Sequence, residues 1–201
     1  MTHPAEHHFP SSQGNICYFE WGRAGEGKSV LLLHATGFHA RCWDKVVDAF
    51  PDGVHVIAVD QLGHGRSAAP IISDWSAVAG ATTELVQSLG ISFAVGAGHS
   101  MGGHCLVQIA ASAPDRVDGL VLIDPVIMAR EFYHDPQDSS ATNEMVAKRR
   151  KSWTGPDAMF ERFRDRHPYK LWDQAVLRDY CEHGLLPDGQ GIGLVNAILI
   201  W

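Results

Sequence analysis

The stretch "GAGHSMGG", residues 96–103, decides the fold. It follows the apolar run "ISFAV" (91–95), which is typical of a buried strand, and it opens the helix-like segment "MGGHCLVQIAASAP" (101–114). Within it, Gly98, Ser100 and Gly102 form the pattern G-x-S-x-G. In such a strand-to-helix turn the serine has a strained backbone that lifts its hydroxyl above the sheet, and the glycines let neighbouring backbone pass without a Cβ. A plain glycine-rich turn with a buried serine is the alternative.

The segments around this turn alternate between strand and helix. Apolar strand-like runs occupy residues 29–34, 54–60 and 117–124, and helical spacing occupies 41–50 and 73–90. We expect Ser73 to cap the longer of these two helices and Gly90 to end it. Runs that are apolar throughout are typical of a parallel sheet covered on both faces. The sequence therefore predicts an α/β fold with a mostly parallel, doubly wound sheet.

Two further segments complete a family resemblance. "HATG" (34–37) follows a strand, and "DQLGHGRS" (60–67) is a glycine-punctuated loop after the next one. Together with the serine turn, they make residues 16–125 resemble the α/β-hydrolase family. The resemblance implies that the loop at 60–67 is structural. It also implies that Ser100 is the nucleophile of acyl-enzyme chemistry, since dehalogenases and epoxide hydrolases of this fold use an aspartate there.

The same resemblance implies an oxyanion hole built from backbone N–H groups. The amide of Met101, at the start of the helix, points to where an oxyanion would form. The second donor is expected near Thr36. The family usually has His-Gly at the start of this loop, and Ala35 replaces that glycine here, so Gly37 stays the alternative donor.

After Asp124 the alternation of strand-like and helix-like segments gives way to helical spacing. We predict an α/β-hydrolase core at residues 1–129, a helical cap at 130–190 and an apolar tail at 191–201. Helices are expected at 139–153, 155–167 and 169–184, with no strand between about 130 and 190. Six aromatic residues of this region would wall a pocket, although aromatics at helical spacing are more often plain core: Trp153, Phe160, Phe163, Tyr169, Trp172 and Tyr180.

No histidine occupies the position that is usual for the family's general base. Its order is nucleophile, acid, histidine, and the 11 residues after position 190 cannot hold another strand–helix–strand unit, which needs about 30. We therefore expect a truncated hydrolase that lacks the last strands, with an exposed sheet edge that the tail covers or that pairs in a homodimer. Asp124 is a candidate acid, with a capping or salt-bridge role as the alternative. Among the histidines, His34 belongs to the oxyanion loop, and His99 and His104 flank the serine and should point elsewhere. His167 and His183 are weak substitutes for the base.

Composition narrows the function classes. The net charge of −7 argues against a nucleic-acid binder, and the one dense basic cluster, residues 148–151, is typical of a solvated face. No apolar run approaches the ~20 residues of a membrane span. The N-terminus lacks a secretory pattern and the four cysteines are scattered, so we expect the cytoplasm. We expect no cofactor and no metal. The predicted substrate is a small hydrophobic ester, thioester, lactone or ketonic C–C compound.

Two other readings compete with a serine hydrolase. One is a non-catalytic α/β-hydrolase-like binding or dimerisation module, which the missing base favours. The other is a nucleotide hydrolase, because "GRAGEGKS" (22–29) matches the phosphate-loop pattern G-x-x-x-x-G-K-[ST]. That pattern needs a helix after it. The strand-like "VLLL" follows instead, so we interpret the segment as a hairpin between two strands.

Overall fold

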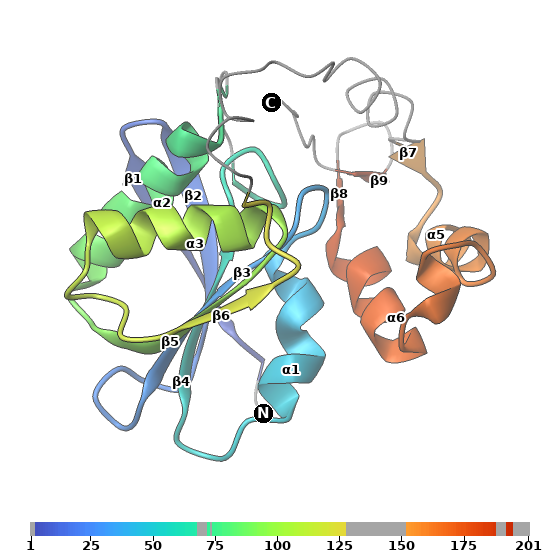
Figure 1. Ribbon diagram of the computed structural model, residues 1–201. Coiled ribbons are helices and arrows are strands. Elements are labelled where there is room, and N and C mark those ends of the chain that lie inside the picture. Colours follow the sequence, from blue (N-terminus) through green and yellow to red (C-terminus); the bar gives the residue numbers. More distant parts are fainter. Residues whose placement is uncertain (1–2, 68–71, 73, 128–151, 188–191, 195–201) are drawn as a thin grey trace.

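The computed structural model describes residues 3–67, 72, 74–127, 152–187 and 192–194. A sheet with its helices forms one part of the molecule, which we call the core, and a smaller group of helices and short strands, which we call the cap, packs beside it (Figure 1). Among the described residues, no helix has the length and apolar character needed to cross a membrane.

The core sheet has six strands in the order β1-β2-β4-β3-β5-β6. β1 and β2 run antiparallel to each other, and β2 runs antiparallel to β4, whereas β4, β3, β5 and β6 are parallel. The predicted α/β fold with a mostly parallel sheet is confirmed. The strands are β1 (Ala5–Ser11), β2 (Gly14–Trp21), β3 (Ser29–Leu33), β4 (His55–Asp60), β5 (Phe93–His99) and β6 (Leu120–Ile123).

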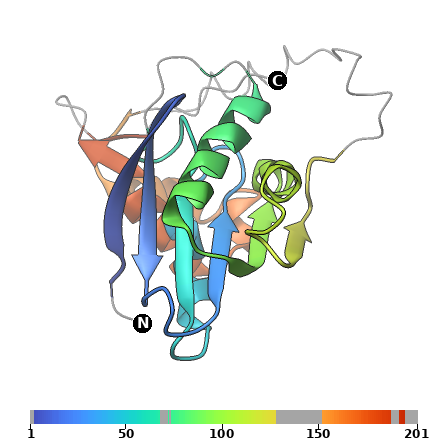
Figure 2. The same cartoon turned by 90° about the vertical axis from the view of Figure 1, so that its left-hand side faces the viewer.

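Helices cover both faces of this sheet (Figure 2). Leu31 and Leu33 pack with residues of α2 (Trp75–Leu89) and α3 (Met101–Ser112). Leu32 packs on the opposite side, with η1 (Ala40–Trp43) and α1 (Asp44–Asp48). Because successive side chains of a strand point to opposite faces, burial on both sides explains why the strand is apolar throughout.

An aspartate caps the start of helix α2, and a glycine ends the helix. Asp74 caps its start, where its carboxylate accepts a hydrogen bond from the Ala77 N–H at 3.0 Å. The expected cap, Ser73, lies outside the described residues. Gly90 ends the helix as predicted, with φ 68° in the left-handed region that glycine adopts without strain.

Strand β6 forms one edge of the sheet and, in the described part of the chain, pairs only with β5. Its four apolar residues, Leu120 to Ile123, are 37–49% exposed. The sheet edge that the sequence predicts is therefore present and exposed. An apolar edge of this kind is a template for pairing with another chain.

The cap contains helices and a small sheet. The predicted cap helices are found as α5 (Pro156–Phe163) and α6 (Gln174–His183), with η3 (Tyr169–Leu171) between them. Strands β7 (Ser152–Trp153), β8 (Leu185–Pro187) and β9 (Ile192–Leu194) pair in the order β7-β9-β8.

The prediction of no strand between about 130 and 190 was wrong, because strands of two or three residues are too short to show a periodicity. The expected helix at 139–153 lies outside the described residues except for its end, which is the strand β7. β9 takes the first residues of the predicted tail into the cap sheet, whereas 195–201 lie outside the described part.

The segment that matches a phosphate loop joins β2 to β3. Strand β4 lies between these two in the sheet, so the prediction of a hairpin was wrong and the segment is a crossover connection. The prediction that no helix follows it is confirmed, since Ser29 is the first residue of β3. The Ser29 hydroxyl lies 2.8 Å from Nδ1 of the buried His55. The serine is therefore engaged inside the sheet and is not presented to a phosphate.

Candidate active site

Ser100 lies in the sharp turn between β5 and α3 with φ 51° and ψ −115°. A non-glycine residue in this left-handed region is strained and persists only where its surroundings hold it. Here the Ser100 N–H donates to the Ile123 carbonyl of β6 at 3.0 Å, and its own carbonyl accepts from Gly103 and His104 at 3.0 and 3.1 Å. The predicted strained turn is present, and both the neighbouring strand and the following helix hold it.

The two glycines of the motif have no space for a side chain. A Cβ on Gly98 would lie 2.5 Å from the Gly102 carbonyl oxygen, and a Cβ on Gly102 would lie 2.3 Å from the Leu33 carbonyl oxygen. Because these neighbours are backbone atoms, they cannot rotate away as a side chain would. The same contact packs the serine turn directly against the end of β3.

The two candidate oxyanion donors come from these touching elements. Met101 is the first residue of α3, and the first N–H groups of a helix have no partner within it. Thr36 lies in a tight turn after β3, which the Phe38 N–H closes by donating to the Ala35 carbonyl at 3.1 Å. Gly37 has φ 79°, which this turn needs. Since Gly102 touches the backbone of Leu33 and His34, the Met101 amide and this turn are neighbours.

A buried pair, His34 and Gln61, holds the start of this turn in place. The Gln61 N–H donates to His34 Nε2 at 2.9 Å, so Nδ1 carries the proton and donates to the Ala35 carbonyl at 2.8 Å. The Gln61 side-chain amide donates to the His34 carbonyl at 2.5 Å. Burial lowers the pKa of His34 well below its ordinary value, and the nearby His64 ring lowers it further. His34 is thus neutral and holds the backbone of the loop to which the sequence assigns it, whereas the role of Gln61 was not predicted.

The carboxylate of Asp60, at the end of β4, holds the loop at 60–67 in place. Its carboxylate accepts from the Ala40 N–H at 2.6 Å and the Arg66 N–H at 2.7 Å, which ties η1 to the loop at 60–67. Burial raises the pKa of Asp60 to about 6, and these two donors act in the opposite direction. A Cβ on Gly65 would lie 2.1 Å from the carboxylate, so this glycine is needed for the loop to close around Asp60.

The candidate acid, Asp124, directly follows β6. Ile123 is opposite His99 in the parallel register, which places Asp124 level with Ser100 on the neighbouring strand. Asp124 is exposed and has φ 44°. Within the described ranges, no hydrogen bond joins its carboxylate to a histidine.

The histidines near the site do not supply a base in the described part of the chain, where none is hydrogen-bonded to the Ser100 hydroxyl. His104 Nδ1 donates to the Val126 carbonyl at 3.0 Å. His183 lies in the cap with Nε2 3.9 Å from an Asp44 oxygen, and burial lowers its pKa to about 4. His167 is exposed, and His99 lines a cavity.

That cavity, of about 240 Å³, lies between core and cap. The core side contributes His34, Ala35, Phe38, Cys42, Trp43 and His99. The cap contributes Trp172, which directly follows η3, and Val176 of α6. Ala35 immediately precedes Thr36 and His99 immediately precedes Ser100. The cavity therefore adjoins both halves of the candidate site.

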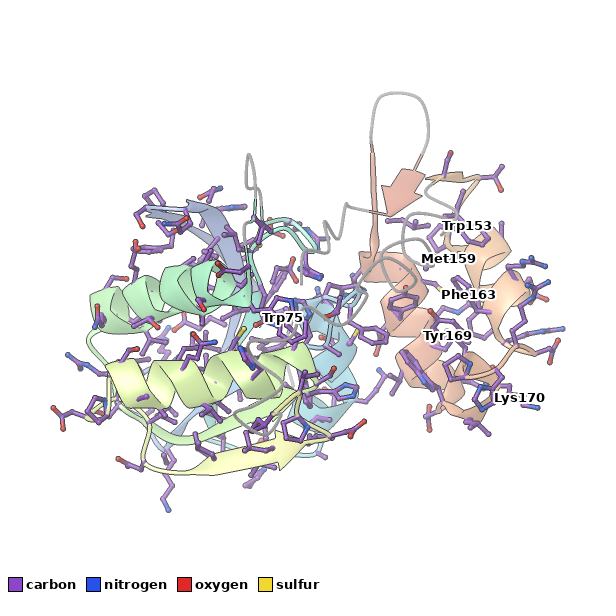
Figure 3. All side chains as sticks on the ribbon, turned by 45° about the horizontal axis from the view of Figure 1, so that its top comes forward. Trp75, Trp153, Met159, Phe163, Tyr169 and Lys170 are labelled. Atoms are coloured by element: carbon purple, nitrogen blue, oxygen red, sulfur yellow. The ribbon has the colours of Figure 1, made fainter. Side chains whose placement is uncertain are left out.

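Of the six aromatic residues expected to wall a pocket, Trp172 lines this cavity. The others form the cap's own core, in which Trp153, Phe163 and Tyr169 gather (Figure 3). The Phe163 and Tyr169 rings lie 4.4 Å apart. The plain-core alternative is thus right for most of them. Phe38, which the sequence did not single out, also lines the cavity and contacts the Trp172 ring, with centroids 5.2 Å apart.

Polar contacts dock the cap on the core. His39 Nε2 donates to the Tyr180 carbonyl at 3.1 Å, and the two rings stack at 5.7 Å and 6°. Lys45 lies 3.5 Å from Asp179. No local pattern could have pointed to His39, because its partner lies 141 residues away.

One side-chain cluster at this junction has the composition of a metal site. Ligand atoms of Asp44, Asp179 and His183 lie within 4.8 Å of one another. The Arg41 guanidinium binds Asp44 at 2.6 Å, and Lys45 pairs with Asp179, so these two cations already balance the carboxylates. A second group, Glu6, His8 and Cys17, includes a carboxylate that already pairs with Arg66 at 3.4 Å. Both clusters are accounted for as ion pairs.

Comparison with known proteins agrees with this geometry. The model of the "Alpha/beta hydrolase family" matches residues 30–193. The chain belongs to the alpha/beta hydrolase family. Among its curated relatives, the lipase LipV of Mycobacterium tuberculosis is 38% identical over 109 residues, and the monoacylglycerol lipase abhd6-A of Xenopus laevis is 34% identical over 123 residues. These matches cover 53% and 57% of this chain.

The alpha/beta hydrolase chain is shorter than these relatives. It covers 40% of the length of the lipase LipV and 36% of that of the frog lipase. The solved structure of an E-2-(acetamidomethylene)succinate hydrolase superposes with a TM-score of 0.79 at 23% identity, over 96% of this chain and 69% of that one. This superposition shows the shared fold.

Proposed function

We propose that this chain is a serine hydrolase that works through an acyl-enzyme on Ser100. The Ser100 oxygen attacks a carbonyl carbon, its proton passes to a base, and the carbonyl oxygen becomes an oxyanion held by the Met101 and Thr36 N–H groups. Collapse of this intermediate expels the leaving group, and water then hydrolyses the acyl-enzyme. The observation that supports the proposal is the strained turn of Ser100, packed against the loop after β3. No described residue is assigned as the base, and Asp124 remains the candidate acid.

The proposed substrate is a small hydrophobic ester, thioester, lactone or ketonic C–C compound. The apolar, aromatic-walled cavity beside Ser100 supports this class. Its described lining holds no Lys or Arg to pair with the carboxylates of a succinate, so we do not extend to this chain the substrate named for the hydrolase of similar structure. The division into core, cap and tail and the cytoplasmic location stay predictions.

Labelling with a fluorophosphonate probe tests the catalytic proposal. We expect the full chain to be labelled at Ser100, read out by peptide mass spectrometry, and Ser100→Ala to remain unlabelled. A hydrolase of the same family with its histidine base serves as the positive control. Absence of label on Ser100 while that control reacts would refute the serine-hydrolase proposal for this chain.

A non-catalytic dimerisation module is the second candidate, because the apolar edge strand β6 is exposed and in the described part pairs only with β5. A second copy could extend the sheet there. Sedimentation equilibrium of the wild type and of Leu122→Lys tests this: a dimer that the substitution dissociates supports the module, and a wild-type monomer at all concentrations excludes it.

A further inference from the structure

A second group of serine, histidine and carboxylate lies in the core sheet, away from Ser100. The Ser29 hydroxyl lies 2.8 Å from Nδ1 of His55, and Nε2 of the same ring lies 2.9 Å from a carboxylate oxygen of Glu20. Ser29 is the first residue of β3, whereas the Ser100 turn packs against the last one, Leu33. The two serines are therefore separated by the length of this strand.

Strand pairing holds these three side chains on one face of the sheet. Ser29 is opposite His55 in the parallel pair of β3 and β4. Glu20 is opposite Ile57 in the antiparallel pair of β2 and β4. Residues two apart on a strand point to the same face, so His55 and Ile57 project together with their partners. The His55 N–H also donates to the Lys28 carbonyl at 3.0 Å, which fixes the backbone beside the serine.

The carboxylate sets the direction of the hydrogen bonds through the ring. An ionised carboxylate only accepts, so Nε2 of His55 carries the ring proton and donates to Glu20. Nδ1 of the neutral ring is then an acceptor, and the Ser29 hydroxyl donates to it. A serine that donates to a histidine whose other nitrogen is held by an acid is the arrangement that activates a nucleophile.

The arrangement reaches solvent at both ends. Ser29 is 6% exposed and directly follows the exposed segment 22–28. Glu20 is half-buried, and its second oxygen lies 2.9 Å from Nε2 of the half-buried His7. His55, between the two ends, is buried. The base is therefore shielded from water, and the low exposure of the serine limits its partner to a small electrophile.

We propose that Ser29 is a second reactive serine, which takes an acyl group from a small activated ester, with His55 as its base and Glu20 as the positioning residue of that base. The Ser29 oxygen attacks the ester carbonyl carbon while its proton passes to Nδ1 of His55. The carboxylate beside Nε2 stabilises the imidazolium that forms. The tetrahedral intermediate then collapses, the bond to the leaving oxygen breaks, and that oxygen takes the proton from Nδ1. The products are an ester on Ser29 and a free alcohol, and the step is independent of Ser100.

Acetylation by p-nitrophenyl acetate tests this proposal in the full chain carrying Ser100→Ala, with peptide fragmentation to separate an acetyl group on Ser29 from one on Lys28. Ser12 is the matched control, because it is exposed and its hydroxyl donates to the Glu84 carboxylate and, among the described residues, to no histidine. General-base catalysis contributes about 10²–10⁴-fold, so we expect Ser29 to react at least ~100-fold faster than Ser12, although it is less exposed. Equal rates for the two serines, or faster acetylation of Ser12, would overturn the proposal.

Unfolding supplies the unassisted rate of Ser29 itself. In the same chain unfolded by urea the serine is fully exposed but has lost its base, so we expect its acetylation to slow by at least ~100-fold. His55→Gln, with its folding checked by circular dichroism, should show the same loss, and the urea measurement decides if this variant does not fold. A rate that rises or stays the same on unfolding, or that survives His55→Gln in the folded chain, would refute the inference.

Glu20→Gln tests the positioning role. The glutamine oxygen still accepts from Nε2 of His55, but the neutral amide no longer stabilises the imidazolium. We expect acetylation of Ser29 to slow by at least ~10-fold and the pH profile of its rate to move to lower pH, because the protonated ring has lost its anion. A merely structural role of Glu20 would leave the pH profile in place, and that result would contradict the proposed arrangement.

This test and that of the hydrolase report on different serines. The fluorophosphonate probe is tetrahedral and bulky, so we expect it to reach the half-buried Ser100 and not the buried Ser29. Acetylation of Ser29 without labelling of Ser100 would remove the hydrolase and keep the second site, and the reverse result would do the opposite.

Discussion

Replacing Gly102 with alanine tests whether backbone contact holds the serine turn closed. The added Cβ would lie 2.3 Å from the Leu33 carbonyl oxygen, about 1 Å short of an ordinary contact, which begins at 3.4 Å. Both partners are main chain, so α3 and β3 must separate. Overpacking of this kind costs about 1–3 kcal/mol, and we take the upper end because no side chain can rotate away. The better helix propensity of alanine returns about 1 kcal/mol. We expect a net destabilisation of about 2 kcal/mol.

Urea unfolding measures this change, and Gly80→Ala is the matched control. Gly80 also lies inside a helix, and a Cβ there would have no heavy atom within 4 Å. Alanine should therefore stabilise at that position by about 0.5–1 kcal/mol. The two variants should move the unfolding midpoint in opposite directions. If Gly102→Ala were as stable as Gly80→Ala, the inferred contact between the turn and β3 would be wrong.

Two further predictions concern residues away from the reacting hydroxyl. Burial lowers the pKa of His39 to about 3, so the unfolded chain takes up the proton first and stability falls as the pH drops below about 6.5. Between pH 6.5 and 5 the His39 imidazole should lower the free energy of unfolding by roughly 1.5 kcal/mol. His39→Gln should reduce this loss of stability, measured by urea unfolding at the two pH values. An unchanged dependence of stability on pH would contradict the assignment. Lys28→Ala should leave calorimetric titrations with ATP and GTP unchanged, because Ser29 is bound within β3; tight binding that depends on Lys28 would overturn our rejection of the phosphate loop.

The serine turn could be predicted from the sequence because its determinants are local. The motif residues Gly98, Ser100 and Gly102 lie within five positions, and each is needed by a contact of the turn itself. The alternation of strands and helices is equally local, since burial on both faces makes the strands apolar throughout.

The rest of the site depends on partners that are distant in sequence. Gln61 holds His34 across 27 residues, and His39 binds Tyr180 across 141. The cavity forms only where Phe38 of the core meets Trp172 of the cap. The strands β7 to β9 are recognisable by their pairing and not by their two or three residues. Patterns within one segment carry no information on such pairs.

The described core holds the proposed nucleophile and oxyanion donors but no proton acceptor for the serine. The Ser100 turn is held by β6 through Ile123 and by β3 through Leu33, so three parallel strands support its strained backbone. These strands and the first turn of α3 also present the proposed oxyanion donors, which require fixed backbone and no titrating side chain. A proton acceptor for Ser100 requires a side chain in hydrogen-bond reach, and the described residues bring none there. The proposed nucleophile and oxyanion donors thus depend on the core sheet, whereas no described residue supplies the proposed base, which is why labelling of Ser100 is the decisive measurement for this chain.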